Sequence, residues 1–190
     1  MKCTSTSSIL EVVQLLLDHK ADVHADNDFA LQWAAANGHL EVVQLLLDHR
    51  ADVHARNDFA LQLAAEKGHL EVVQLLLACG ANVHADNDFA LRWVARNGHL
   101  KIVQLLLDHK ANAHADNDCA LQWAAKNEHW DVAELLLTYG SNLGVLSDEH
   151  RMTLVEIQTS RIDELEVHFN VQFVNETYFE KGITSNILIP

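Results

Sequence analysis

The sequence repeats itself every 30 residues over most of its length. The peptide EVVQLLLDH begins at Glu11 and again at Glu41, and altered copies begin at Glu71, Lys101 and Asp131. Self-similarity at a fixed step of this size is typical of stacked structural units, each of which buries its apolar face only against its neighbours. The sequence therefore predicts one elongated domain.

Each repeat is predicted to contain two short helices. In the unit formed by residues 26–55, we expect the first helix to run from Phe29 to about Asn37 and to end at Gly38. Asp28 is the expected N-cap of this helix. The second helix is apolar except for one polar stripe, which indicates burial on three sides. Both helices are shorter than the roughly 12 to 15 residues needed for stability in isolation, so the stack must stabilise them.

The residues at the ends of the second helices predict where the backbone is strained. The equivalent positions at these ends are occupied by Lys20, Arg50, Gly80, Lys110 and Gly140. A left-handed backbone at such a position suits glycine and costs another residue on the order of 1 kcal/mol. We therefore expect the three junctions with Lys or Arg to be strained.

The segment AAEKGHLEVVQLLLACGANVHA, from Ala64 to Ala85, resembles the ankyrin repeat, and the likeness recurs from residue 11 to about residue 145. The resemblance implies an all-α fold, an ankyrin-type α-solenoid of stacked helix-turn-helix repeats. The usual family unit has about 33 residues and begins with TPLHxA, whereas the repeats here begin with FALQWAA or a variant of it. Aligning the alanine pairs places the missing residues in the turn, so very short inter-repeat turns are expected. This shortened form resembles the ankyrin arrays encoded by giant DNA viruses.

The repeat pattern divides the chain into segments. In chain order these are an N-terminal extension (1–8), a half repeat (9–25), four ankyrin-like repeats (26–55, 56–85, 86–115 and 116–145), a degenerate capping repeat (146–169) and a C-terminal tail (170–190). The half repeat begins directly with a second helix of the buried type. We therefore expect an exposed apolar face there, with fraying or self-association. The tail is interpreted as a docked strand, a loose segment or a short docking peptide.

Charge and composition narrow the classes of partner. Thirteen Lys and Arg against 27 Asp and Glu give a net charge of −14, which disfavours phosphate backbones and anionic membranes. Neither nucleic acid nor a membrane is therefore expected as a partner. The start MKCTSTSS lacks the apolar core of a signal peptide, and the three cysteines show no CxxC spacing. We expect a cytoplasmic protein, in the host cytoplasm if it is viral.

The family resemblance also implies a binding surface, since ankyrin arrays bind proteins through the turn tips and the exposed edge of the first helices. The candidate protein-binding residues are Asp26, Asn27, Gln32, Asn37, Arg56, Asn57, Gln62, Glu66, Lys67, Asp86, Asn87, Arg92, Arg96, Asn97, Asp116, Asn117, Gln122, Lys126 and Asn127. These edge positions vary between repeats while the apolar positions hardly change, which fits either recognition or free drift of exposed residues. Most basic residues of the array fall on this edge. We expect a concave strip less negative than the convex back, suited to an acidic or mixed-charge protein segment.

No metal site and no cofactor are predicted from the histidines and tryptophans. Eleven of the 13 histidines recur at three repeat positions, where equivalent side chains run parallel about 8 to 10 Å apart, too far for one zinc ion. One set, expected to bond turn backbone, is His39, His69, His99 and His129. Trp33, Trp93 and Trp123 share their repeat position with Leu63, which favours apolar core over ligand stacking.

Catalysis is not expected either. Cys79 replaces a histidine at a helix end and Cys119 replaces a core phenylalanine, and neither stands in a catalytic pattern with a base. The sequence therefore favours a non-enzymatic module that binds a protein partner of unknown identity along the concave face. Two alternatives stay open. One is a structural protein that self-associates through the uncapped N-terminal half repeat, and the other is an adaptor whose C-terminal tail recruits a second protein.

Overall fold

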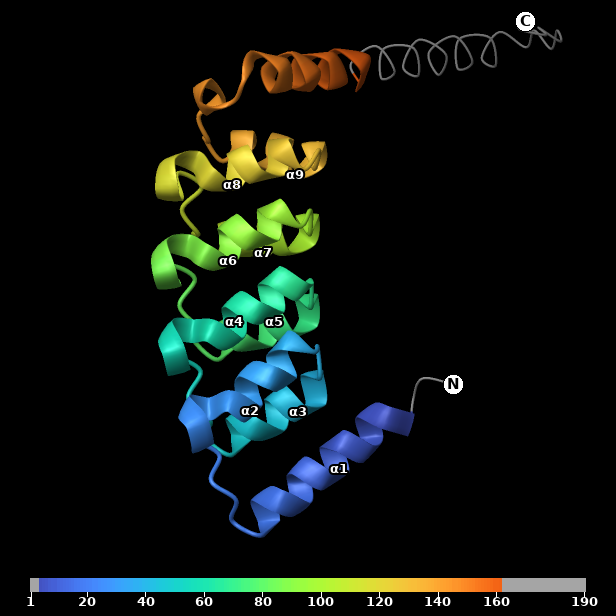
Figure 1. The fold of residues 1–190 in the computed structure, drawn as a ribbon, viewed down its shortest axis with the longest axis vertical. Helices are drawn as coiled ribbons and strands as arrows, with labels where there is room; N and C mark the ends of the chain where they lie inside the picture. Colours follow the sequence, from blue (N-terminus) through green and yellow to red (C-terminus); the bar gives the residue numbers. More distant parts are fainter. Residues whose placement is uncertain (1–3, 162–190) are drawn as a thin grey trace, which may run out of the picture. The chain divides into compact units, whose positions relative to one another are not determined.

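The computed structural model describes residues 4–161 of the chain, and these residues form helices joined by short turns (Figure 1). The chain forms two compact units, Met1–Leu146 and Ser147–Pro190. In the second unit, residues 148–161 are helical. Residues 162–190, which include part of the expected capping repeat and the whole tail, lie outside the described residues. The interpretation of residues 146–169 as a capping repeat therefore stays a prediction.

The first unit is a stack of helix pairs. The helices that open the repeats are α2 (Ala25–Ala36), α4 (Ala55–Lys67), α6 (Ala85–Arg96) and α8 (Ala115–Lys126). The helices that close them are α1 (Thr4–Asp18), α3 (Leu40–Asp48), α5 (Leu70–Ala78), α7 (Leu100–Asp108) and α9 (Trp130–Thr138), followed by a short 3-10 helix, η1 (Leu143–Val145). Opening helices pack on one another in chain order, and so do the closing helices. This arrangement confirms the all-α solenoid that the repeats predict.

Small residues let the opening helices approach closely. Ala34 and Ala35 of α2 are fully buried, and so are the residues at these two positions in the other three repeats. Each opening helix also buries one leucine, such as Leu31, while each closing helix contributes residues such as Val43 and Leu46. The core is therefore a continuous apolar column, and each segment of it is built by two adjacent repeats.

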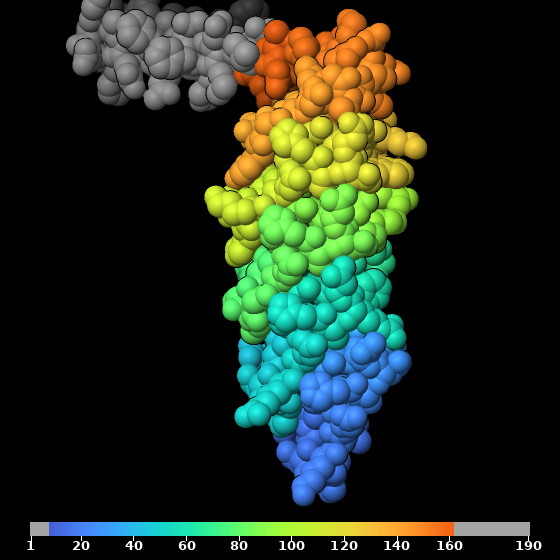
Figure 2. All heavy atoms as spheres, turned by 90° about the vertical axis from the view of Figure 1, so that its left-hand side faces the viewer, coloured from blue at the N-terminus to red at the C-terminus, as the bar shows by residue number. Residues whose placement is uncertain are grey.

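A left-handed turn precedes the right-handed part of every opening helix. The φ angles of Asp26, Asn27 and Asp28 are +51°, +60° and +58°, and the equivalent residues of the other three repeats have nearly the same values. Asn and Asp adopt this conformation more readily than other non-glycine residues. The right-handed helix accordingly begins at Phe29, as the sequence predicts. Figure 2 shows the side of the stack on which these turns lie.

The expectation that Asp28 caps its own helix is wrong. Its buried carboxylate accepts a hydrogen bond at 2.8 Å from the backbone N–H of Asp52, in the turn that leads into α4. Its Oδ1 lies 3.1 Å from Nδ1 of His24, which belongs to the preceding half repeat. Asp58, Asp88 and Asp118 accept the equivalent backbone N–H bonds at 2.7, 2.8 and 3.0 Å. A carboxylate at this position connects the start of one repeat with the segment that leads into the next, so it stabilises the stack instead of one helix end.

The predicted left-handed helix ends are confirmed. Lys20, Arg50 and Lys110 have φ angles of +63°, +69° and +72°. At the same three ends, the histidine before the Lys or Arg donates from Nδ1 to a carbonyl of the last turn. These bonds are His19 to Leu15, His49 to Leu45 and His109 to Leu105, at 2.8, 2.8 and 2.9 Å. Each of these carbonyls also accepts the backbone N–H of the same histidine, so the imidazole adds a second hydrogen bond at the helix end.

Helix α1 has an exposed apolar face, as the sequence predicts. Val12, Leu15 and Leu16 are each more than half exposed, whereas the equivalent Val42 and Leu46 of α3 are buried. In α3 the equivalent residues are covered because that helix packs against α2, the opening helix of its own repeat. The helix begins at Thr4, inside the segment interpreted as an extension.

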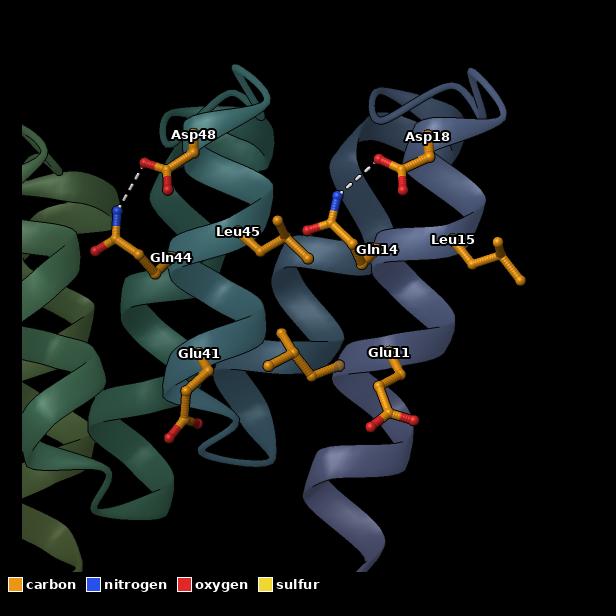
Figure 3. A pocket seen from close by; sticks show the side chains of 9 residues that line it. Glu11, Gln14, Leu15, Asp18, Glu41, Gln44, Leu45 and Asp48 are labelled. Carbon is orange, nitrogen blue, oxygen red and sulfur yellow. Dashed lines mark hydrogen bonds between the residues drawn. The ribbon is translucent and has the colours of Figure 1, made fainter.

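A groove of about 570 Å³ lies between α1 and α3 (Figure 3). Its rims are the polar stripes of the two helices, which are Glu11, Gln14 and Asp18 on α1 and Glu41, Gln44 and Asp48 on α3. Leu45 points from α3 towards α1, while Leu15 points away from α3. Within residues 4–161, no helix is both long enough and apolar enough to cross a membrane.

Candidate protein-binding face

One stripe of each opening helix points away from the core. On α2, Phe29 is 50% exposed and Trp33 is 44% exposed, and Asn37 at the end of the helix is exposed as well. We call the first-helix face the surface formed by residues 26, 27, 29, 33, 36 and 37, by their equivalents 30, 60 and 90 positions further along, and by Arg92 and Gln122. Its tips are the residues of the left-handed turns.

Most candidate residues lie at the surface of this face. The exposed ones are Asp26, Asn27, Asn37, Arg56, Asn57, Lys67, Asp86, Asn87, Asn97, Asp116, Asn117, Lys126 and Asn127. The half-buried ones are Glu66, Arg92, Arg96 and Gln122. The array therefore brings them together in one strip across the four repeats of the first unit.

Gln32 and Gln62 do not lie on the exposed edge, and that expectation is wrong. Both side chains are buried, and their Nε2 atoms donate to the backbone oxygens of Asn27 and Asn57 at 2.6 and 2.7 Å. The left-handed turn leaves this carbonyl pointing back at the helix, where the amide satisfies it. Gln122 makes the same bond to Asn117 at 2.7 Å but is half-buried.

Arg92 occupies the glutamine position in the third repeat and takes over its role. Its Nε and one terminal nitrogen donate to the backbone oxygens of Asn87 and Asp86 at 3.2 and 2.9 Å. The other terminal nitrogen pairs with Asp116 of the next repeat at 3.2 Å. All three nitrogens of its guanidinium group therefore make bonds within the array.

Arg96 and Lys126 form a different arrangement, because aromatic rings hold their charges. The Arg96 guanidinium lies 4.6 Å from the ring centre of Trp93 and 4.9 Å from that of Trp123. Lys126 Nζ lies 5.0 Å from the centre of the Trp123 ring. Contacts of this kind attract a cation to the face of the ring. No carboxylate among residues 4–161 forms an ion pair with either cation.

The tryptophan column is at the surface, so the expectation of an apolar core position is wrong. Trp33 is exposed, and Trp93 and Trp123 are half-buried beside the cations. Sequence reasoning thus missed the aromatic residues of this face. The signal was present, because Phe29, Trp33 and Asn37 follow one another at steps of four and so share one helix stripe.

Two of the histidines expected to bond turn backbone do so across repeats. His69 Nε2 donates to the backbone oxygen of Ala36 at 3.0 Å, and His99 Nε2 donates to that of Glu66 at 3.2 Å. His39 instead packs against the Trp33 ring, with 5.2 Å between the ring centres. Within the described range 4–161, no three His, Cys, Asp or Glu side chains gather as a metal ion would require.

One hydrogen-bonded cluster on the closing helices shifts pKa values. The Tyr139 hydroxyl donates to Asp108 Oδ1 at 2.7 Å, and Gln104 Nε2 donates to the same oxygen at 2.9 Å. The bond from Tyr139, and then that from Gln104, lowers the pKa of Asp108. The same bond to Asp108 raises the pKa of Tyr139. The cluster connects α7 with the end of α9.

The stacked helix pairs and their exposed polar edge define a helical-repeat protein. Its sequence matches the family model of ankyrin repeats (three copies) over residues 1–87 and 61–146, so the chain belongs to the ankyrin repeat family. Ankyrin repeats are protein–protein interaction modules and are typically non-enzymatic. No curated protein sequence matches the chain.

Proposed function

We propose that the chain is a non-enzymatic module that binds a protein partner along the first-helix face. The observation that carries this proposal is the exposure of large aromatic rings beside cations on that face. Phe29 and Trp33 are about half exposed, and Arg96 and Lys126 lie against indole rings. Exposed aromatic rings and arginine are the residue types that contribute most to protein interfaces.

The charge of this face sets the class of partner. The chain carries a net charge of −14, yet five of its 13 basic residues lie on the candidate strip: Arg56, Lys67, Arg92, Arg96 and Lys126. The closing helices present acidic stripes, such as Glu41 and Asp48. An acidic or mixed-charge protein segment is therefore attracted to the first-helix face and repelled by the opposite side.

Affinity capture with two charge-matched variants tests the proposal. Arg96→Glu and Lys101→Glu each change the charge by −2, but only Arg96 lies on the first-helix face. Lys101→Glu also restores the residue that Glu11, Glu41 and Glu71 provide in the other repeats. We expect Arg96→Glu to lose the partner captured by the unmodified chain and Lys101→Glu to retain it. Equal capture by both variants would contradict the proposal.

A structural role is the second candidate, and the uncovered face of α1 favours it. Val12, Leu15 and Leu16 are exposed, so we propose that a second copy of the chain covers them. Because the chain is strongly acidic, added salt strengthens such association. Sedimentation over a concentration series tests this candidate. It predicts a concentration-dependent dimer for the unmodified chain and a monomer for Leu15→Glu, and a monomer in both cases would exclude it.

The adaptor alternative assigns a second partner to residues 170–190, which lie outside the described residues. Deleting these residues and repeating the capture distinguishes it, because an adaptor loses one partner and keeps the other. The giant-virus origin and the cytoplasmic setting rest on the sequence alone and stay predictions.

A further inference from the structure

We propose that Arg96 and Lys126 form a subsite for two adjacent carboxylates of an acidic protein segment, with Trp123 between the two cations. This inference rests on the proposed function and specifies its chemistry. The carboxylates mark one end of the bound segment, and an apolar side chain of the same segment contacts Phe29 and Trp33 at the other end.

The rings hold the two cations in place before a partner arrives. Arg96 lies between Trp93 and Trp123, at 4.6 and 4.9 Å from their centres, and Lys126 lies 5.0 Å from the centre of the second ring. The two cations are contributed by adjacent repeats, from the ends of α6 and α8. A side chain that is already ordered loses less conformational entropy on binding. The pair is therefore preorganised for an anionic group.

The two cations also differ from the other basic residues of the strip in lacking an acidic partner. Arg92 pairs with Asp116, Lys67 with Glu66, and Arg56 with Asp26. No ion pair within residues 4–161 includes Arg96 or Lys126. The planar guanidinium of Arg96 carries five N–H donors, and an arginine beside aromatic rings can still bind a carboxylate in bidentate fashion.

The residues of the strip differ between the first and the last repeats, and this difference sets the orientation in which the acidic partner segment binds. At the position of Arg96 and Lys126, the first repeat has Ala36 and the second has Glu66. The first repeat instead exposes Phe29 and Trp33. The face is therefore apolar at α2 and cationic at α6 and α8. Only a segment that is acidic at one end and apolar at the other matches both parts.

The separation of these two parts sets the length of the segment. Neighbouring helices lie about 8 to 10 Å apart, so α2 and α6 are separated by roughly 16 to 20 Å. An extended chain spans about 3.3 Å per residue, so about six residues connect the acidic pair to the apolar side chain.

An NMR titration tests the subsite, because the indole N–H signals of the four tryptophans report on different places. The probe is an amidated peptide with two glutamates, a six-residue Gly-Ser spacer and one phenylalanine. We expect it to shift the signals of Trp33, Trp93 and Trp123 and to leave that of Trp130 on α9 unchanged. Replacing the glutamates by glutamines removes the shifts at Trp93 and Trp123. Replacing the phenylalanine by alanine removes the shift at Trp33.

Variants distinguish a built subsite from general attraction to an acidic peptide. Arg96→Gln and Lys126→Gln each weaken binding about threefold, which is within the range for exposed ion pairs, while Lys101→Gln leaves binding unchanged. Trp123→Leu, which installs the residue found at position 63, keeps both charges and weakens binding about two- to fivefold, the usual range for an exposed cation–π contact.

The subsite is excluded if the glutamine peptide shifts Trp123 as strongly as the glutamate peptide, or if Lys101→Gln weakens binding as much as Arg96→Gln. This failure is distinguishable from failure of the proposed function. If the chain does not bind the peptides but Arg96→Glu abolishes capture of the partner, the module function stands and only this subsite is excluded. A chain that binds the peptides but captures its partner equally well with Arg96→Glu contradicts the proposal that the partner binds along the first-helix face.

Discussion

The imidazole of His99 lies in the space that a side chain at Gly68 would need. A Cβ at Gly68 would lie 2.7 Å from His99 Cε1, closer than real Cβ atoms come to other atoms. The same relationship joins Gly38 to His69 and Gly98 to His129, at 2.5 Å in both pairs. The histidine of each repeat therefore packs onto the glycine of the repeat before it, and each residue type is needed because of the other.

We predict that Gly68→Ala destabilises the array more than Gly80→Ala. Both glycines have positive φ angles, +81° and +93°, but a Cβ at Gly80 meets no atom within 4 Å. The backbone cost alone is about 1 to 2 kcal/mol, and only Gly68→Ala adds the displacement of His99. Thermal and denaturant unfolding of the two variants measure the difference. Equal losses of stability would show that the imidazole yields without cost.

Asp58→Asn should destabilise the array by about 1 to 3 kcal/mol, because it weakens a buried, hydrogen-bonded bridge between repeats. Asp58 Oδ1 lies 3.0 Å from His54 Nδ1 and accepts the backbone N–H of Asn82 at 2.7 Å. The matched control is Asp26→Asn, which changes an exposed residue of the same left-handed turn type and should cost under about 0.5 kcal/mol. Denaturant unfolding that ranks the control above Asp58→Asn would contradict the bridge.

The cluster of Asp108 and Tyr139 predicts pH dependence at both extremes. The folded-state pKa of Tyr139 is raised above 10.0, so its contribution is complete below pH 10 and is lost as the pH rises through the folded value. The pKa of Asp108 is lowered below 3.8, so its contribution is lost as the pH falls through that lower value. Tyr139→Phe should remove the alkaline loss. Melting temperatures of both proteins from pH 8 to pH 11 check this, and parallel curves would contradict it.

Amide hydrogen exchange should be faster in α1 than in α5. The two helices share most of their sequence, but α5 packs against α3, α4 and α7, whereas Val12 and Leu16 of α1 are exposed. Local opening of a less covered helix requires less free energy. Exchange measured by mass spectrometry on residues 9–25 and 71–83 compares them. Equal protection would mean that another part of the protein, or another copy, covers α1.

The sequence predicts the parts of the fold that depend on periodicity. The 30-residue step places Gly38, Gly68 and Gly98 at the ends of the opening helices, and all three have positive φ angles. The buried closing helices follow from their apolar pattern. Residues at matching positions have similar surroundings in every repeat. A correct structural assignment for one repeat therefore applies to the whole array.

The sequence is less informative about polar and aromatic residues at the edge of the opening helices. The sequence predicts that Gln32 is exposed. Its side-chain amide is buried instead, because it donates to the backbone carbonyl of Asn27 in the left-handed turn. The sequence predicts that Trp33 lies in the core because Leu63 occupies the equivalent position, although both residues lie on the outer stripe of their helices. Such errors arise because burial there depends on the turn conformation, which the hydrophobic pattern does not specify.

Site-directed photocrosslinking tests the central claim that the first-helix face binds the partner. A photoreactive phenylalanine analogue replaces Trp33 or Asn127 on this face, or Gln74 or Lys101 on the closing helices. In extract that contains the captured partner, we predict a crosslinked species from positions 33 and 127 and none from positions 74 and 101. Crosslinks only from the closing helices would contradict the account.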